Sequence, residues 1–204
     1  SAFNFPVAVW AWNAALALVC GNALVWKPSE KTPLVALASV ALLERAISRY
    51  RAEGGVVPDG LSQVLVGRAD VGEAMVKDAR VALISATGST RMGRAVASIA
   101  VTRFAKTILE LGGNNAMIVA PTADLKMVQT AALFSAVGTA GQRCTSLRRL
   151  IVHTSIADQL LPRLKSAYAS IRIGNPLETT TLVGPLAGQA LELEAPHHQD
   201  DQPR

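Results

Sequence analysis

Apolar and polar positions alternate along the chain in blocks that predict helices and short strands in turn. Helices are expected at about residues 7–20, 32–53, 69–77, 89–103, 123–137 and 156–171, and strands at about 22–27, 61–66, 81–86, 107–111, 116–119 and 149–153. Gly21 suits the left-handed position just past the first helix, and Thr32 is expected to cap the second helix ahead of Pro33. Short apolar strands that alternate with helices are typical of a parallel sheet. We therefore predict an α/β fold that contains part of a doubly wound parallel sheet.

The first uncharged stretch needs a separate interpretation, because residues 5–26 carry no charge and are long enough to cross a membrane. Pro6, Asn13 and the Gly21-Asn22 pair divide this stretch into a helix, a turn and a strand. We favour a buried helix–strand unit over a membrane span, and no membrane partner is expected.

Composition narrows the class of protein. Half of the 204 residues are hydrophobic and 17% are charged, which favours a folded core over disorder. This length allows one full domain or parts of two. The net charge of +5 comes from scattered basic residues without interleaved aromatic residues, so a solvated surface is preferred to nucleic-acid binding.

Cysteine and histidine usage points to a reducing compartment and away from a metal site. The two cysteines lie far apart in unlike settings and do not form a disulfide framework, so we expect a cytoplasmic protein. Cys20, at the end of an apolar helix, is expected to pack in the core. His153, His197 and His198 lack the spacing of metal ligands.

Two segments carry candidate chemistry. Glu110 opens Glu-Leu-Gly-Gly-Asn-Asn, and Cys144 lies in Gly-Gln-Arg-Cys-Thr behind a glycine-containing approach, Gly138–Gly141, that we expect to be flexible. A thiol that is activated by a lowered pKa or a neighbouring base is a nucleophile near neutral pH. A carboxylate whose pKa is raised by burial can take a proton from water. The alternatives are a structural cysteine and a solvent-facing carboxylate at a strand end.

Both segments resemble motifs of the aldehyde dehydrogenase superfamily. Further matching motifs are Asn4-Phe5-Pro6, Gly21-Asn22, Trp26-Lys27-Pro28-Ser29-Glu30 and Thr87-Gly88-Ser89-Thr90 with Gly93. They follow the family's order, and the resemblance runs from about Asn4 to about Leu186. Within the family, the sequences of these motifs are most similar to those of the antiquitin branch, the α-aminoadipic semialdehyde dehydrogenases.

The resemblance implies the roles of three catalytic residues. Cys144 would attack an aldehyde, and Glu110 would activate the water that releases the acid product. Asn4 would donate a hydrogen bond to the oxyanion together with the backbone N–H of Cys144. The implied reaction is NAD-dependent oxidation of an aldehyde to its carboxylic acid.

The resemblance also implies a cofactor site and a substrate contact. Lys27, Ser29 and Glu30 would meet the adenosine ribose, where an acidic side chain favours NAD over NADP. The turn at Gly88, Ser89 and Gly93 would meet the pyrophosphate, and Leu111 also belongs to the predicted cofactor contacts. Arg143 would face the distal carboxylate of the substrate, with a purely local electrostatic role as the alternative. The parent protein is expected to be a homo-oligomer, a dimer or tetramer.

The predicted organisation has three parts. Residues 1–112 would be the second part of an NAD-binding domain, residues 113–187 the first part of a catalytic domain, and residues 188–204 a disordered tail. We therefore interpret the chain as an internal fragment of a longer enzyme. Two further hypotheses stay open: a catalytically inactive fragment that keeps the site residues, and a stand-alone nucleotide-binding module.

Overall fold

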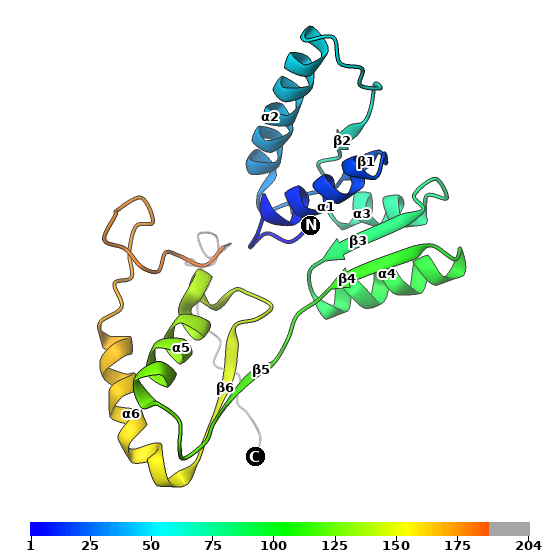
Figure 1. The fold of residues 1–204 in the computed structure, drawn as a ribbon. Helices are drawn as coiled ribbons and strands as arrows, with labels where there is room; N and C mark the ends of the chain where they lie inside the picture. Colours follow the sequence, from blue (N-terminus) through cyan, green and yellow to red (C-terminus); the bar gives the residue numbers. More distant parts are fainter. Residues whose placement is uncertain (188–204) are drawn as a thin grey trace, which may run out of the picture. The chain divides into compact units, whose positions relative to one another are not determined.

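The computed structural model describes residues 1–187, in which helices and short strands alternate (Figure 1). The chain separates into two compact units. The first is Ser1–Gly112 and the second begins at Gly113, and each unit is described by itself. The roles predicted for these parts, cofactor binding and catalysis, stay predictions. The predicted tail at 188–204 lies outside the described residues.

Every predicted helix and strand is present, and each end falls within two residues of its expected position. The first unit contains α1 (Ala8–Val19), β1 (Leu24–Trp26), α2 (Pro33–Ala52), β2 (Ser62–Val64), α3 (Ala69–Lys77), β3 (Leu83–Thr87), α4 (Thr90–Thr102) and β4 (Lys106–Glu110). The second contains β5 (Asn115–Val119), α5 (Leu125–Val137), the 3₁₀ turn η1 (Gly138–Gly141), β6 (Leu147–Val152) and α6 (Thr154–Ala169).

Strands that follow one another in sequence pair in parallel. β1 pairs with β2, β3 with β4, and β5 with β6, and each pair is joined by a helical crossover. The α/β class is therefore confirmed. Among the described residues the three pairs are not hydrogen-bonded to one another. In each pair, within this part of the chain, the two strands form backbone hydrogen bonds only with each other.

Each strand pair carries its own small core. Trp26 lies against α2 and stacks on Trp10 of α1 with 5.1 Å between ring centroids. Ile84 of β3 packs against α4, and Val119 of β5 packs against Leu160 of α6. Full burial of one such aliphatic side chain stabilises a fold by about 1.5–3 kcal/mol. These cores hold the strand ends where the predicted site residues lie.

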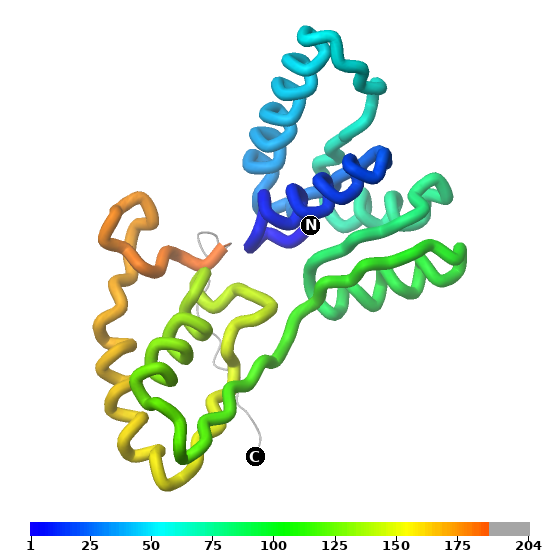
Figure 2. The backbone as a smooth tube through the Cα atoms, viewed as in Figure 1, coloured from blue at the N-terminus to red at the C-terminus, as the bar shows by residue number. Residues whose placement is uncertain are grey.

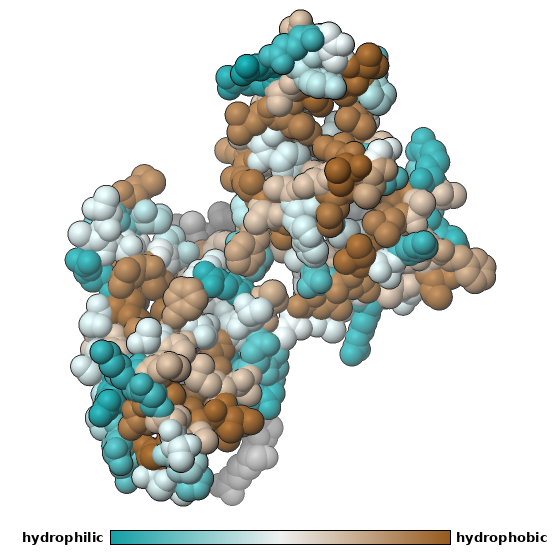
Figure 3. Space-filling view, viewed as in Figure 1, coloured by the Kyte–Doolittle hydropathy of each residue, from teal (hydrophilic) through white to brown (hydrophobic). Residues whose placement is uncertain are grey.

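The expectation that Cys20 packs in a core is wrong. Cys20 is exposed at the end of α1, and Ala14 is the one residue of this helix that is fully buried. α1 contacts its unit through one face only, so Trp12, Leu16 and Val19 are exposed as well. Hydrophobic residues lie at the visible surface of both units (Figure 3). No helix in residues 1–187 combines the length and apolar character that a membrane span requires.

The prediction for the end of α1 is confirmed, whereas the prediction that Thr32 caps the start of α2 is wrong. Gly21 has a φ of 73°, as predicted, and its N–H donates to Leu18 O while the N–H of Asn22 donates to Ala17 O, which is a Schellman motif. Thr32, in contrast, makes no capping hydrogen bond, and its hydroxyl is buried without a partner. Pro33 does occupy the first turn of α2.

Candidate active site

The predicted nucleophile lies in the loop between α5 and β6, residues 138–146, which we call the cysteine loop. Figure 2 shows the backbone leaving α5 and returning into β6 through this loop. The thiol of Cys144 is exposed. The loop follows β5 and α5 in the chain but meets the start of β5 in space, because β5 and β6 run in parallel and begin side by side at Asn115 and Leu147.

The first half of the loop is a hydrogen-bonded left-handed turn, and the flexibility expected for it stays a prediction. Thr139, Ala140 and Gly141 have φ values of 56°, 53° and 69°. This conformation costs an L-residue about 1–2 kcal/mol, so Thr139 and Ala140 need support from their surroundings. Side chains provide it: Arg143 Nε donates to Thr139 Oγ1 over 2.8 Å, and Arg148 Nη2 donates to Gly141 O over 2.7 Å.

The second half of the loop is a tight turn with Cys144 at its corner. The N–H of Ser146 donates to Arg143 O over 3.2 Å, and the N–H of Arg143 donates to Ser146 Oγ over 3.1 Å. Ser146 is completely buried. Asn115 Nδ2 donates to Cys144 O over 2.7 Å and to Ser146 O over 3.1 Å. The corner of the turn therefore presents Cys144 while its base is fixed to β5.

Gly113 makes the close approach between these segments possible. A Cβ at this position would lie 2.8 Å from Cys144 O and 2.8 Å from Asn115 Oδ1. The second glycine of the Leu-Gly-Gly turn is therefore required by steric contact with the cysteine loop. A Cβ at Gly112 would have its nearest neighbour, Thr90 Oγ1, at 4.0 Å.

The predicted base and the predicted pyrophosphate turn lie together in the first unit. Glu110 pairs with Thr87 at the carboxyl ends of β4 and β3, and the N–H of Gly88 donates to Glu110 O over 3.0 Å. Ser89 caps α4 by accepting a hydrogen bond from the N–H of Met92 over 3.1 Å. The Glu110 side chain is exposed within this unit.

Gly93 and Leu111 complete this group of residues. A Cβ at Gly93 would lie 2.5 Å from Leu111 Cδ2, so the absence of a side chain lets α4 approach the end of β4. Leu111 thereby packs over the first turns of α4. Ligands of open α/β sheets bind at the carboxyl ends of the strands, where this group lies.

The predicted ribose contacts follow β1 in the same unit. Lys27 Nζ pairs with Glu30 Oε2 at 3.3 Å, and Ser29, which is buried, accepts a hydrogen bond from the N–H of Lys31 over 3.2 Å. A hydrogen bond from its own backbone N–H, followed by the contact with Lys27, holds the pKa of Glu30 below its usual value. Glu30 is therefore a carboxylate at neutral pH.

Asn4 lies in a turn ahead of α1 and is half-buried. The segment that carries it runs against the loop after β1: the amino group of Ser1 donates to Lys27 O over 2.7 Å, and Lys31 Nζ lies 5.1 Å from the centroid of the Phe3 ring. Asn4 and Glu110 thus belong to the first unit and Cys144 to the second.

Arg143 is engaged by its own loop. Besides its bond to Thr139, its guanidinium lies over the Phe134 ring at 5.4 Å from the centroid. Cation–π contacts of this kind contribute about 0.5–1 kcal/mol at exposed sites. The substrate contact predicted for Arg143 stays a prediction, and it would compete with these two contacts.

The structure adds Asn115 and Ser146, to which the sequence analysis assigned no role. The position of Asn115 in the Leu-Gly-Gly-Asn-Asn segment was the one feature of the sequence that could have pointed to it. Its hydrogen-bond partners lie 29 and 31 positions away in the chain, so the sequence alone does not pair them. Within residues 1–187, no cluster of histidine, cysteine, aspartate and glutamate side chains could hold a metal ion.

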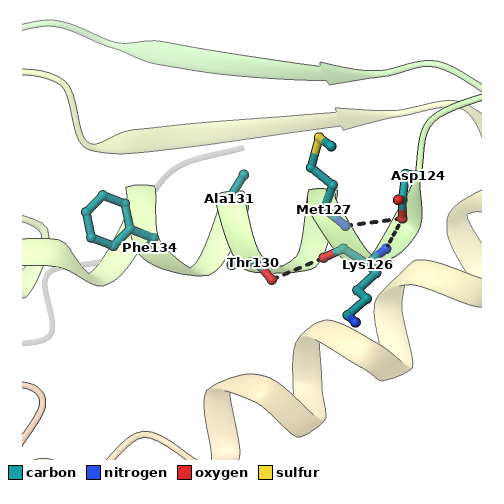
Figure 4. Close-up of a pocket in the computed structure, with 6 residues that line it drawn as sticks. All are labelled: Asp124, Lys126, Met127, Thr130, Ala131 and Phe134. Atoms are coloured by element: carbon teal, nitrogen blue, oxygen red, sulfur yellow. Dashed lines mark hydrogen bonds between the residues drawn. The ribbon is translucent and has the colours of Figure 1, made fainter.

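An open hollow of about 460 Å³ lies along α5 and contains none of the predicted site residues. Figure 4 shows that its lining side chains all come from this helix and its cap, Asp124, whose carboxylate accepts hydrogen bonds from the N–H groups of Lys126 and Met127. Met127 and Phe134 are exposed in it. The hollow therefore belongs to neither group of predicted site residues.

The parallel strand pairs, the Glu-Leu-Gly-Gly turn and the cysteine loop agree with a family assignment from sequence. Residues 1–196 match the Aldehyde dehydrogenase family, and the chain belongs to that family.

Comparison with individual proteins gives a more specific similarity. The chain is 54% identical over 191 residues to a Caenorhabditis elegans protein described as an aldehyde dehydrogenase family 7 member A1 homolog, covering 93% of this chain and 35% of that protein. It is 50% identical over 186 residues to alpha-aminoadipic semialdehyde dehydrogenase from Bos taurus, covering 91% of this chain and 34% of that enzyme. The chain thus spans about a third of the length of these relatives.

Solved structures confirm the fold. PnpE from Pseudomonas sp. WBC-3 superposes with a TM-score of 0.84 at 34% identity, covering 93% of this chain and 37% of that chain. PnpE has also been solved in complex with nicotinamide adenine dinucleotide, and that structure matches with a TM-score of 0.84 at 34% identity, covering 92% of this chain and 37% of that chain.

The adjacent glycines of the Leu-Gly-Gly turn provide a test of the contact with the cysteine loop. Gly113→Ala places a methyl group against Cys144 O and Asn115, and we expect it to lower the free energy of unfolding by about 1–3 kcal/mol. Gly112→Ala, which has room for its methyl group, is the matched control and should change stability by less than about 0.5 kcal/mol. Urea denaturation measures both. Equal effects of the two substitutions would refute the close approach at Gly113.

Proposed function

We propose that the protein to which this chain belongs oxidises an aldehyde to its carboxylic acid with NAD as hydride acceptor, and that Cys144 is its nucleophile. The observation that carries the proposal is the cysteine loop, in which an exposed thiol lies at the corner of a turn whose backbone is hydrogen-bonded on both sides of Cys144. Membership of the aldehyde dehydrogenase family supports it. Cys20 is exposed as well, so the hydrogen-bonded turn around Cys144, and not exposure alone, separates the two thiols.

The residues of the first unit fit a dinucleotide. The carboxylate of Glu30 and the ammonium of Lys27 follow β1, where they suit ribose hydroxyls. The turn at Gly88 and Ser89 begins the 13-residue helix α4, whose first N–H groups suit a pyrophosphate. A charged Glu30 repels a 2′-phosphate, and this supports NAD over NADP. When bound, the nicotinamide ring takes up the hydride that the aldehyde carbon loses.

The proposed chemistry of the chain's own residues has two stages. The thiolate of Cys144 adds to the carbonyl carbon, and the resulting oxyanion accepts hydrogen bonds from Asn4 Nδ2 and the N–H of Cys144. One such donor contributes about 3 kcal/mol to the transition state. Loss of hydride from the same carbon converts the adduct to a thioester. Glu110 then takes a proton from water, the water oxygen attacks the thioester, and the acid leaves with regeneration of the thiolate.

The substrate that we propose is α-aminoadipic semialdehyde, which carries an amino-acid carboxylate far from its aldehyde. Arg143 is the candidate partner of that carboxylate, because a guanidinium offers two parallel donors to a carboxylate. The similarity to the Bos taurus enzyme of that name supports this substrate. A homo-oligomeric parent in the cytoplasm also belongs to the proposal.

The alternative proposal is that this chain by itself does not turn over. It spans about a third of the length of its relatives, and its three strand pairs keep open edges within the described residues. A further alternative, a nucleotide-binding module, would bind NAD without chemistry.

The test of the proposed function is NADH formation by the purified chain with NAD and α-aminoadipic semialdehyde, followed by absorbance. We expect sustained turnover that Cys144→Ala lowers by more than about 10³-fold, because the nucleophile is lost. Cys20→Ser is the matched control, because it removes the exposed thiol outside the site, and it should retain activity. Activity that persists in Cys144→Ala would refute the assignment.

Two null results separate the alternatives. NAD binding without turnover, measured by calorimetry, would favour the nucleotide-binding module. Neither binding nor turnover would favour the inactive fragment.

Arg143→Ala tests the substrate assignment in the same assay. Loss of a hydrogen-bonded charge pair is expected to lower kcat/KM for α-aminoadipic semialdehyde by about 10- to 100-fold while hexanal oxidation changes little. Arg163→Ala, an exposed arginine on α6 of the same unit, is the control. An equal loss for both aldehydes would show that Arg143 acts on the loop or the thiol and does not bind a carboxylate.

A further inference from the structure

Asn115 makes the link between β5 and the cysteine loop. It is half-buried at the first position of β5, and its amide nitrogen donates to Cys144 O over 2.7 Å and to Ser146 O over 3.1 Å. A side-chain amide nitrogen carries two hydrogens, so one asparagine can serve both carbonyl groups. Because both partners are acceptors, the nitrogen of the amide, and not its oxygen, must face them.

Asn115 and Ser146 together fix both peptide groups that flank Cys144. The carbonyl of Cys144 belongs to the following peptide group and is held by Asn115. The carbonyl of Arg143 belongs to the preceding peptide group and accepts the N–H of Ser146 over 3.2 Å. The two planes that determine the orientation of Cys144 are therefore set by hydrogen bonds from outside the residue itself.

This arrangement also directs the N–H of Cys144. In a trans peptide the C=O and N–H groups point in opposite directions, so the N–H of Cys144 points away from Ser146. Among the described residues of the second unit, this N–H has no hydrogen-bond acceptor. It is thus presented on the outside of the turn, as an oxyanion donor requires.

We propose that Asn115 is a positioning residue for the nucleophile: through the carbonyl of Cys144 it holds the thiol and the oxyanion-binding N–H in their reactive arrangement. This inference rests on the proposed function of Cys144. It requires the donor capacity of the Asn115 amide, and not only its volume. A carboxylate of the same shape would place negative charge against two carbonyl oxygens.

The strand pair supports this role for Asn115. The register of β5 and β6 shifts at this point, because Asn115 pairs with Leu147 and Ala116 pairs with Arg149. Arg148 is the extra residue of this bulge, and its side chain reaches back to Gly141 O. Bulges often occur beside active sites, where they redirect side chains. Side chains from the two strands therefore hydrogen-bond to both halves of the cysteine loop: Arg148 of β6 to the first half and Asn115 of β5 to the second.

The neighbouring asparagine offers a matched control. Asn114 is exposed, and its Oδ1 accepts a hydrogen bond from Arg149 Nε over 3.2 Å. Asn114→Asp and Asn115→Asp introduce the same charge at adjacent positions. The first keeps the acceptor that Arg149 uses, whereas the second removes the donor that the cysteine loop uses.

The experiment is amide hydrogen exchange of the 204-residue chain, read by mass spectrometry on peptides that cover residues 138–147. Asn115→Asp is expected to speed exchange in this segment about tenfold, with α6 unchanged as the internal reference, because loop hydrogen bonds are lost locally. Asn114→Asp should leave it within about twofold. Asn115→Gln, which keeps the amide, should recover part of the protection.

Unchanged exchange in Asn115→Asp, or an equal increase in α6, would overturn the positioning role, and so would a glutamine variant that behaves like the aspartate. Turnover gives the second readout: Asn115→Asp should lower kcat about 10²-fold without changing KM for NAD, because a small misplacement of a nucleophile is costly. If the exchange results are as expected but the unsubstituted chain shows no chemistry at Cys144, one of the two alternatives without turnover is favoured, and the role of Asn115 in shaping the loop remains.

Discussion

Parallel pairing of consecutive strands is the constraint on which the candidate site depends. In β3 and β4 it aligns the carboxyl ends, so that the turn at Gly88 lies beside Glu110. In β5 and β6 it aligns the amino ends, so that Asn115 lies beside the cysteine loop. The short segment from Glu110 to Asn115 joins these two strand ends. One motif of six residues thus contributes to both groups of site residues.

The contacts within the cysteine loop explain how a strained backbone is maintained beside the thiol of Cys144. Two consecutive non-glycine residues in the left-handed region would be unfavourable in an isolated peptide. Here the side chains of Arg143 and Arg148 bond to the turn, and Asn115 and Ser146 bond to the residues around Cys144. Strain that is held by surrounding hydrogen bonds is common where a side chain must be presented in one orientation.

Local chemistry made most of the fold predictable from sequence. Gly21 and Pro33 mark where the first helix ends and the second begins, and the alternation of strands and helices defines the α/β class. Burial was less predictable. Cys20 and much of α1 are apolar yet exposed, because only one face of that helix meets the rest of its unit.

The candidate site could be identified from the sequence only where motifs mark it. Cys144, Glu110 and the glycine turns stand out by residue type and context, whereas Asn115 and Ser146 gain their roles from contacts across about thirty positions. The left-handed turn at Thr139 could not be predicted either, since a β-branched residue is disfavoured there. Such features depend on which segments meet, and that information is not local.

The central claim is that Cys144 carries the acyl group during aldehyde oxidation and that Glu110 releases it. The most direct measurement is peptide mass spectrometry of the Glu110→Gln chain after mixing with NAD and hexanal. Our account predicts that a hexanoyl thioester accumulates on the peptide that contains Cys144 and not on the one that contains Cys20. An unmodified Cys144 peptide, or acylation of both cysteines alike, would contradict it.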